Sequence, residues 1–494
     1  MDSPRTLPPA CDCYDIVHRR DASFDGVLYV GVLTTGVYCR PVCRARPPRP
    51  ENCRYFASAA RAEAARFRPC LACRPELAPG LHGRAAPAPR TLAGHVATLL
   101  DAYVGTNVRR PVDVVAAAMG VTTAQLRRQF ATQHGVTPAQ YLLTRRLLLA
   151  KQLLTDTDVP VAEVALASGL AGAPRLTRCF LTRYAMHPSR LRARPSLMPP
   201  GAQTPWRVRL AYRPPYDVTS QLRFLDRRAV TGVEWVQGRH VRRSVPAGLW
   251  GPSAGWIEVT LSPTAARVEL RYASSLGPQS AQVIAAVRRW LDLDAAPDVI
   301  DAALTDLPGS PGLRLPGCLD PFELVVRAIL GQQVSVAAAR TLAGRLVQRF
   351  GEPARTPWPQ VTHHFPSAQR LAQASPGQVD TLGILPSRAR TIVDLAQAWA
   401  PIQACLALPD PVQPLIERLL GVCGIGRWTA HYVAMRTLGW TDAFLHDDVA
   451  VLKAMRQLFR IEPRREVLAR AASWQPWRSY AVLRLWNSLE GSSA

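Results

Sequence analysis

Lysine is nearly absent from this sequence. Lys151 and Lys453 are the only two, although the chain has 60 basic residues and a formal net charge of +24. An enzyme that forms a Schiff base with its substrate needs an amine such as that of lysine, so this chemistry has only two candidate side chains. The other basic residues are arginines, and a guanidinium group binds phosphate through paired hydrogen bonds. This charge favours a protein that binds nucleic acid.

Long apolar segments are also missing. No apolar run approaches the roughly 20 residues of a membrane-spanning helix, and the opening residues MDSPRTLPPACDC lack the apolar core of a signal peptide. We therefore expect a cytoplasmic protein with no membrane partner. A chain of 494 residues is long enough for roughly three or four domains, each with its own hydrophobic core.

Cysteine is scarce after residue 73. Seven of the eleven cysteines lie within the first 73 residues, which in an intracellular protein favours metal binding or reactive thiols over disulfides. Cys39 and Cys43 form a Cys-x3-Cys pair, and Cys70 and Cys73 form a Cys-x2-Cys pair after a helix predicted at 58–66. Two close pairs separated by one small unit are typical of a four-thiolate Zn²⁺ site. The simplest interpretation is a structural zinc ion.

The segments around these cysteines, TTGVYCRPVCRAR and FRPCLACRP, resemble the amino-terminal domain of the Ada family of alkylation-response proteins. The resemblance implies that Cys39 irreversibly accepts a methyl group from a methylphosphotriester in DNA, while the other three cysteines complete the zinc site. Zinc would keep Cys39 as a nucleophilic thiolate. Methylation would remove one negative charge and so weaken the repulsion of DNA phosphates. The nearest cations for holding the DNA backbone are Arg40, Arg44, Arg46 and Arg68.

An internal repeat of about 50 residues follows, between 90 and 195. The repeated positions are Leu126 and Leu176, Phe130 and Phe180, and Pro138 and Pro188. Each copy has two predicted helices around a glycine turn, at Gly120 and Gly169, which is the pattern of a helix-turn-helix unit. Helices predicted at 123–133 and 174–184 would read DNA, and a helix predicted at 138–154 would join the two units.

The two units together resemble the AraC-type DNA-binding domain. The resemblance implies a transcription activator that binds promoter sites in double-stranded DNA and acts on RNA polymerase. The side chains expected to face the major groove are Gln125, Arg127, Arg128, Arg175, Thr177 and Arg178. A less specific interpretation is that the two units only add affinity for DNA.

The remainder of the chain changes from a mixed pattern to a helical one. Apolar residues alternate at 208–212, 257–261 and 268–272, which predicts strands, and 279–291 predicts an amphipathic helix. From Pro321 onward the pattern is helical. Segments rich in proline, glycine and other small residues predict linkers at 74–90 and 196–205.

Gly424 and Gly426 separate two amphipathic helical patterns. The glycines permit a turn so tight that main-chain N–H groups at the start of the second helix can bind one DNA phosphate. Arg427 and Thr429 are further candidates for DNA contacts. Taken alone, a Gly-x-Gly segment between two helices is usually only a connection.

Asp448 is the second residue of an Asp-Asp pair that opens another apolar helix. An aspartate before a helix is usually an N-cap. Its spacing from the glycine turn, with Trp428 and Tyr432 between the two features, instead favours a functional site. This order of hairpin, helix, loop and aspartate resembles the helix-hairpin-helix DNA glycosylase superfamily.

A second resemblance covers nearly all of the carboxy-terminal half. The matching segments are YRPPYD, PGLRLPGCLDPFELVVRAILGQQVSV, GIGRWTAHY, FLHDDV and QPWRSYAVLRLW, and they resemble the AlkA family of alkyl-base DNA glycosylases, DNA-3-methyladenine glycosylase II. The resemblance implies that Asp448 is catalytic and that Trp428, Tyr432 and Trp486 line the base pocket. Three positions depart from the family pattern. Gln333 replaces a leucine that enters the DNA, Cys423 replaces a proline of the hairpin, and Val449 replaces an aromatic residue.

The expected mechanism begins with extrusion of the damaged base from the DNA stack. Alkylated purines such as 3-methyladenine and 7-methylguanine carry positive charge, so aromatic rings hold them by stacking and cation–π attraction. The charge also makes the base a good leaving group, and no general acid is required. One ionised carboxylate, that of Asp448, then stabilises the oxocarbenium-like sugar and orients a water molecule. We expect Asp447 to cap the helix or to orient its neighbour.

Two alternatives remain for the carboxy-terminal half. A lysine occupies the position of Trp428 in superfamily members that cleave the backbone, so a glycosylase with lyase activity would have to use Lys453 or Lys151. Alternatively, the chain is a transcriptional regulator whose carboxy-terminal half only binds DNA. No cysteine follows Cys423, which excludes the iron–sulfur cluster of some relatives, and the Pro-Cys-His-Arg motif of a methylguanine methyltransferase is missing.

The sequence therefore predicts a multidomain α+β alkylation-repair protein. It would join a monofunctional glycosylase to a sensor and transcription activator. The predicted parts are a small zinc-binding α+β methyl-acceptor domain at 1–82, an all-α tandem helix-turn-helix domain at 90–195, an α+β subdomain at 205–300, and an all-α helix-hairpin-helix glycosylase domain at 301–494.

Overall fold

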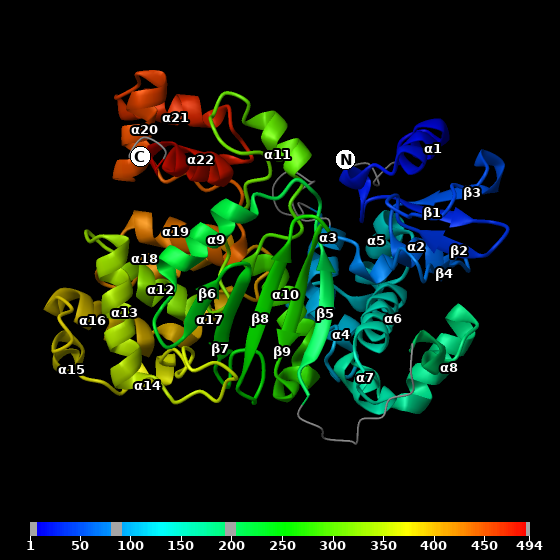
Figure 1. Cartoon of the computed structure of the whole chain (residues 1–494), viewed down its shortest axis with the longest axis horizontal. Helices are drawn as coiled ribbons and strands as arrows, with labels where there is room; N and C mark the ends of the chain where they lie inside the picture. Colours follow the sequence, from blue (N-terminus) through cyan, green and yellow to red (C-terminus); the bar gives the residue numbers. More distant parts are fainter. Residues whose placement is uncertain (1–6, 81–90, 193–203, 491–494) are drawn as a thin grey trace. The chain divides into compact units, whose positions relative to one another are not determined.

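The computed structural model describes residues 7–80, 91–192 and 204–490. It forms two compact units, an amino-terminal unit of residues 1–214 and 266–285 and a carboxy-terminal unit of residues 215–265 and 286–494. The predicted linkers at 74–90 and 196–205 lie largely outside the described residues. Within the described segments, no helix is long and apolar enough to cross a membrane. Figure 1 labels the elements.

The cysteine-rich module, residues 7–80, contains a four-stranded sheet of order β3-β1-β2-β4. Its elements are α1 (Ala10–Arg19), β1 (Tyr29–Val32), β2 (Val37–Cys39), β3 (Cys53–Phe56), α2 (Ala59–Ala64) and β4 (Arg68–Pro69). Strand β1 pairs antiparallel with β2 and β3, whereas β2 and β4 are parallel with Tyr38 opposite Pro69. Cys39 ends β2 and Cys70 follows β4, so parallel pairing brings both cysteine pairs to one end of the sheet.

The helical module of the amino-terminal unit confirms the tandem helix-turn-helix prediction. Its helices are α3 (Leu92–Ala102), α4 (Pro111–Ala118), α5 (Thr123–His134), α6 (Pro138–Asp156), α7 (Val161–Ala167) and α8 (Ala173–Tyr184). The repeated leucines and phenylalanines are all buried, so equivalent positions of the two copies form equivalent cores. Gly120 and Gly169 adopt positive φ angles of 66° and 72°, which glycine tolerates without a steric penalty.

The strands that follow are antiparallel. In the amino-terminal unit, β5 (Trp206–Ala211) pairs with β9 (Arg267–Tyr272), with Val208 opposite Leu270. In the carboxy-terminal unit, β6 (Glu234–Gln237), β7 (His240–Val245) and β8 (Gly255–Ser262) form a meander. The predictions of β5, β8, β9 and helix α10 (Ser280–Trp290) are confirmed.

Between residues 204 and 291, the sequence analysis missed two strands and one helix: β6, β7 and α9 (Val218–Arg228). Strand β7 lacks a clear apolar alternation because Arg243 is buried in it. The Arg243 guanidinium pairs with Glu234 at 2.9 Å and with Glu323 at 2.6 Å. A buried arginine of this kind is stable only with its carboxylate partners. One of these partners is far from Arg243 in the sequence, so the sequence alone does not show that the two residues pair.

The carboxy-terminal unit is otherwise helical. Its helices are α11 (Pro297–Ala303), α12 (Pro321–Leu330), α13 (Val336–Phe350), α14 (Ala368–Ala372), α15 (Pro376–Asp380), α16 (Pro386–Gln397), α17 (Trp399–Cys405), α18 (Val412–Leu420), α19 (Arg427–Leu438), α20 (Val449–Phe459), α21 (Arg464–Ala472) and α22 (Arg478–Glu490). One hydrophobic core joins α12, α13, α16 and α18, and another joins α11, α20 and α22. Helix α19 contributes Val433 to the first core and Met435 to the second, so its position is determined from both sides.

Candidate active site and metal centre

The four predicted zinc ligands come together. The sulfur atoms of Cys39, Cys43, Cys70 and Cys73 all lie within 4.8 Å of one another. Cys70 is buried and the other three are half-buried. The Cys70 N–H donates to the Tyr38 carbonyl at 3.0 Å, which ties the second cysteine pair to the strand that carries Cys39. The clustering predicted from the sequence is confirmed.

The chemistry of these thiols fits a divalent cation. The hydrogen bond with Cys39 lowers the pKa of Cys43 to about 7 and lowers the pKa of Cys70 as well. The pKa of Cys39 is raised, chiefly by its hydrogen bond to Cys43. Four thiols this close therefore share protons and do not all ionise on their own. A divalent cation such as Zn²⁺ stabilises all four as thiolates.

Arg40, one of the cations predicted to hold the DNA backbone, is buried. It is 7% exposed, and its Nε donates to Asp25 Oδ1 at 2.8 Å while Nη1 donates to the Cys73 carbonyl at 3.1 Å. It therefore orients the loop of the second cysteine pair, because a buried guanidinium needs such partners. Of the other predicted cations, Arg44 and Arg46 are exposed and Arg68 is half-buried.

Glu63 is a structural residue that the sequence analysis missed. Its buried carboxylate accepts hydrogen bonds from the hydroxyl groups of Tyr38 at 3.2 Å, Tyr184 at 2.8 Å and Thr144 at 2.8 Å. Burial raises the pKa of Glu63, although the hydrogen bond from Thr144 opposes this shift. Tyr38 precedes Cys39 and Tyr184 ends α8, so one carboxylate links the strand of the methyl-acceptor candidate to the second recognition helix.

Both predicted recognition helices present arginines to solvent. Arg127 and Arg128 on α5 are exposed, as are Arg175 and Arg178 on α8. Gln125 and Thr177, also predicted to face the major groove, are half-buried. The exposure is compatible with DNA contacts, which remain predictions.

The turn between α18 and α19 has the predicted hairpin form. Gly424 has a φ angle of 88°, and a Cβ atom there would lie 2.1 Å from Thr391 Oγ1, so the fold requires glycine. Gly426 is different, because its φ angle is −88° and an added Cβ would meet nothing within 4 Å. No side chain caps α19. The main-chain N–H groups at its start therefore lack a side-chain acceptor, and the open space at Gly426 leaves room for an anion to bind them.

Thr429, a predicted DNA contact, is buried. It is 2% exposed, and its hydroxyl oxygen accepts a hydrogen bond from Gln332 Nε2 at 3.3 Å. The same amide donates to the Gly424 carbonyl at 3.1 Å. Gln332, which the sequence analysis missed, therefore attaches the α12–α13 turn to the hairpin. Gln333 is exposed on that turn with a φ angle of 53°, and Arg427 is exposed beside the hairpin.

Asp448 is held by three N–H donors. Its Oδ2 accepts from Trp428 Nε1 at 2.8 Å, and its Oδ1 accepts from Trp486 Nε1 at 3.1 Å and from the Val451 main chain at 2.9 Å. The last bond makes Asp448 the N-cap of α20. Capping and catalysis are therefore compatible roles for one carboxylate, because an N-cap aspartate is rigidly oriented.

Asp447 does not have the predicted capping role. Its side chain is 43% exposed and lies 3.5 Å from the Arg464 guanidinium and 3.4 Å from His446 Nε2. Val449, the position that departs from the family pattern, is 81% exposed. The side chains on either side of Asp448 therefore face solvent, whereas the Asp448 carboxylate faces the two tryptophans.

The three predicted pocket aromatics surround Asp448. Trp428 and Tyr432 on α19 are stacked, with ring centroids 5.1 Å apart and an interplanar angle of 8°. Trp486 on α22 lies 6.4 Å from Tyr432 at an angle of 53°. All three rings are half-buried. The arrangement offers aromatic surfaces next to an oriented carboxylate.

Arg436 lies beneath this aromatic cluster and was missed by the sequence analysis. Its Nη1 donates to the Tyr432 hydroxyl at 2.5 Å, and its Nη2 donates to the Gly317 carbonyl at 2.9 Å. Burial raises the pKa of Tyr432, but nearby guanidinium groups, that of Arg436 foremost, leave that pKa below its usual value. The spacing of four residues on one helix was the available signal, since such residues share a face.

Four protein-family models match successive parts of the chain. The metal binding domain of Ada matches residues 12–76, and a helix-turn-helix domain matches residues 115–194. The AlkA N-terminal domain matches residues 207–320, and the HhH-GPD superfamily of base excision DNA repair proteins matches residues 326–479. The resemblances inferred from the sequence are confirmed.

Curated relatives match either the whole chain or one half of it. The "Probable bifunctional transcriptional activator/DNA repair enzyme AlkA" of Mycobacterium tuberculosis is 35% identical over 489 residues, which are 97% of this chain and 96% of the relative. DNA-3-methyladenine glycosylase 2 of Escherichia coli is 39% identical over 56% of this chain and 95% of its own. The E. coli "Bifunctional transcriptional activator/DNA repair enzyme Ada" is 36% identical over 25% of this chain and 32% of its own.

Proposed function

The chain belongs to the family of AlkA-type bifunctional transcriptional activators and DNA repair enzymes, and we propose which residues carry out its two reactions. Asp448 catalyses the release of alkylated bases from DNA, and Cys39 accepts methyl groups from the DNA backbone. The observation that carries the first assignment is the position of Asp448, whose two oxygens are oriented by two indole N–H groups beside three aromatic rings.

Base release follows from this geometry. A target base leaves the stack at a cost of about a few kcal/mol and packs against Trp428, Tyr432 or Trp486. The C1′–N bond breaks, and its electron pair leaves with the base and neutralises the positive charge of a 3-methyladenine or 7-methylguanine. The Asp448 carboxylate stabilises the positive sugar and takes the proton of the water that adds to C1′. The hairpin at Gly424 and Gly426 holds one phosphate of the same strand.

Methyl transfer uses the cysteine cluster. Zn²⁺ bound by the four sulfurs would supply thiolate character at Cys39. The Cys39 sulfur attacks the methyl carbon of a methylphosphotriester, the C–O bond breaks, and the phosphate keeps that electron pair as a diester anion. The site loses one negative charge, so its repulsion of the surrounding phosphates falls. Exposed Arg46 and Arg44 are the candidates for backbone contacts.

The helical module would direct the methylated protein to promoter DNA. Helices α5 and α8 would enter the major groove of promoter DNA, with Arg128 on the first and Arg178 on the second contacting bases or phosphates. An activator bound there would act on RNA polymerase. Because both activities use chromosomal DNA, we assign the protein to the cytoplasm.

Release of free bases from methylated DNA tests the proposal directly. The full chain should liberate 3-methyladenine and 7-methylguanine from duplex DNA treated with a methylating agent, as measured by chromatography of the released bases. Tight DNA binding without any base release would instead favour a regulator whose carboxy-terminal half only binds DNA.

We expect no Schiff-base chemistry. Lys151 is buried and its Nζ lies 2.6 Å from Glu76, so its amine is occupied. Lys453 is exposed on α20, where a lysine usually extends into solvent. Borohydride reduction of the protein on abasic DNA should therefore trap no covalent adduct. An adduct that disappears in Lys453→Ala would contradict the monofunctional mechanism.

The two hairpin glycines should respond differently to substitution. Gly426→Ala fits the negative φ angle and the open space, so the free energy of unfolding should change by less than about 0.5 kcal/mol. DNA affinity should nevertheless fall about tenfold, because the methyl group occupies the space of a phosphate. Gly424→Ala should destabilise the fold by at least about 1 kcal/mol, owing to its positive φ angle.

Denaturant unfolding and fluorescence anisotropy on a duplex with an abasic-site analogue would measure both effects. Gly439→Ala, which also changes a glycine of positive φ but lies at the other end of α19, is a control for folding alone. Wild-type affinity in Gly426→Ala would rule out a phosphate contact at the hairpin.

A further inference from the structure

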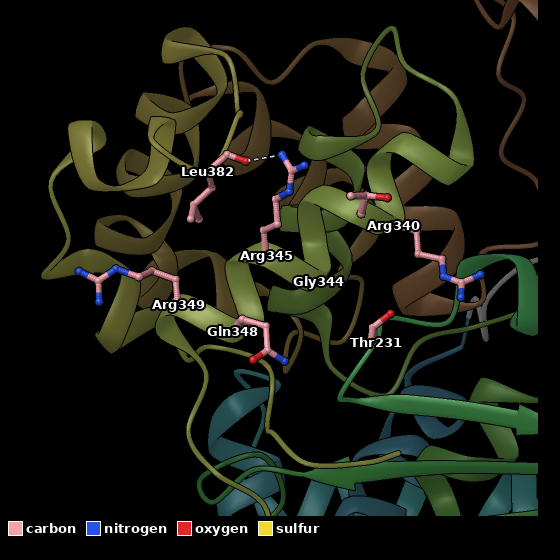
Figure 2. Close-up of a pocket in the computed structure, with 8 residues that line it drawn as sticks. Thr231, Arg340, Gly344, Arg345, Gln348, Arg349 and Leu382 are labelled. Atoms are coloured by element: carbon pink, nitrogen blue, oxygen red, sulfur yellow. Dashed lines mark hydrogen bonds between the residues drawn. The ribbon is translucent and has the colours of Figure 1, made fainter. Parts of the chain in front are cut away.

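We propose that a pocket along α13 binds phosphate groups of the DNA backbone outside the base-release site. The pocket has a volume of about 560 Å³. Its lining includes Arg340, Arg345, Arg349 and Gly344 of α13, with Thr231 and Leu382 from neighbouring segments (Figure 2). The proposal rests on the glycosylase function, because it concerns the same duplex.

The charge of the pocket is entirely positive. All three arginines are exposed, and no carboxylate contributes to the lining. Among the residues that the structure describes, none forms an ion pair with these three guanidinium groups. In Figure 2, Arg340 lies on one side of Gly344, and Arg345 and Arg349 lie on the other. An anion that enters the pocket is therefore flanked by positive charge on both sides.

The pocket is partly preorganised. Arg345 Nη1 donates to the Leu382 carbonyl at 2.9 Å, which holds that guanidinium in one place and reduces the entropy lost on binding. A Cβ atom at Gly344 would have Thr231 Cβ, at 3.8 Å, as its nearest neighbour, so the floor is open. Gln348 and Thr341 add neutral polar groups to the lining.

The dimensions favour a run of backbone phosphates over one small anion. Arg340 and Arg349 are separated along the helix by about 14 Å, at a rise of about 1.5 Å per residue. Nine residues are also about two and a half helical turns, so Arg340 and Arg349 extend from opposite sides of α13. A guanidinium fork binds phosphate oxygens through two parallel hydrogen bonds, so arginines spread in this way suit several phosphates of a DNA backbone.

The pocket begins close to the predicted DNA contact. Helix α13 starts just after the turn of Gln332 and Gln333, and Gln332 is bonded to the hairpin at Gly424. Arg340 lies about 6 Å along the helix from Val336, the first residue of α13, at about 1.5 Å per residue. A duplex held at the hairpin extends for many base pairs beyond it as a stiff rod. Backbone on the flank of the lesion is therefore the ligand whose position and charge fit the pocket.

A charge-matched pair of full-length variants tests this inference. The pocket variant is Arg340→Gln, Arg345→Gln and Arg349→Gln. The control variant is Arg370→Gln, Arg390→Gln and Arg465→Gln, which removes three exposed arginines of the same unit. Both variants keep the amino-terminal unit, so its contribution to DNA binding cancels. Anisotropy measures the Kd for a long duplex with an abasic-site analogue between about 0.05 and 0.2 M salt. Over this range the affinity that comes from phosphate contacts falls steeply with salt.

We expect the pocket variant to bind about 10- to 100-fold more weakly than the control. The slope of log affinity against log salt should also shrink by about 2 to 3 relative to the control, since each lost phosphate contact removes about 0.9. Single-turnover base release at saturating protein should be unchanged, because the pocket residues are separate from Asp448. Binding remains measurable even if the wild type releases no base, so failure of the glycosylase assignment is recognised separately.

Two results would overturn the inference. One is an equal Kd and salt slope for the pocket and control variants. The other is a pocket variant that binds DNA like the control but loses affinity for ADP, tested as a soluble polyphosphate, because the pocket would then serve a small anion.

Discussion

Asp448→Asn is expected to lower the single-turnover rate of base release by about 100- to 1,000-fold, which is the usual effect of removing one preorganised electrostatic group. Affinity for a duplex with an abasic-site analogue should stay within a few-fold of the wild type. The reaction loses the negative charge that stabilises the positive sugar, whereas the DNA-binding hairpin is unaffected. Release of radiolabelled 3-methyladenine under single-turnover conditions measures the rate.

The substitution should leave the fold intact. Asparagine caps helices about as well as aspartate, and its amide oxygen can still accept from the Val451 N–H and the Trp486 indole. Its amide nitrogen cannot accept the hydrogen bond from Trp428 Nε1, so a local shift of one ring is the main structural cost. Thermal unfolding within a few degrees of the wild type would show that the lost rate is chemical.

Asp447→Asn is the matched control. It removes the same charge from the adjacent residue, whose carboxylate is exposed and paired with Arg464. Its rate should remain within about threefold of the wild type, since exposed ion pairs contribute little. Equal losses in the two variants would mean that general electrostatic attraction, and not an oriented carboxylate, drives base release.

Cys39→Ala is expected to reduce methyl transfer from methylphosphotriester DNA to background. The reason is that the nucleophilic sulfur is removed, and none of the other three cysteines of the cluster occupies its position at the end of β2. Incubation with DNA that carries labelled methylphosphotriesters, followed by measurement of the label bound to the whole protein, measures the transfer, and mass spectrometry of the wild-type peptide with Cys39 locates it. Undiminished labelling of the Cys39→Ala protein would reject this acceptor.

Other cysteine variants separate the acceptor role from the ligand role. Cys70→Ala should lose bound zinc together with methyl transfer, because Cys70 is buried in the cluster. Cys53→Ala changes a half-buried cysteine outside the cluster and should transfer at the wild-type rate. Zinc content determined by metal analysis distinguishes these cases, and base release by the same samples shows that the carboxy-terminal unit is folded.

Features encoded by nearby residues were predictable. Short sequence spacings define the two cysteine pairs, the tandem helix-turn-helix repeat and the glycine hairpin. The local geometry of each feature can be predicted from such a spacing. Helices α5 and α8 begin within one residue of their predicted starts and end within one residue of their predicted ends. Strands β5 and β9 alternate between buried and less buried residues, so their periodicity was visible.

Features that depend on distant partners were not predictable. Arg40 and Arg46 are equal candidates in the sequence, but only Arg40 finds the Asp25 carboxylate and becomes buried. Strand β7 was missed because Arg243 is stabilised by Glu323, which is far away along the chain. The contact of Gln332 with Gly424 likewise depends on how separate segments pack.

The sequence alone determined the classes of chemistry in this chain: thiolates at metal-ligand spacing, aromatic residues and an aspartate after a glycine hairpin, and arginine in place of lysine. Tertiary structure decided which of several chemically equivalent residues is placed to act. It oriented Asp448 and exposed Asp447, and it buried Arg40 and Lys151 against carboxylates. The physical reason is that charge and nucleophilicity belong to a residue type, whereas burial and hydrogen-bond partners arise only from contacts between distant parts of the chain.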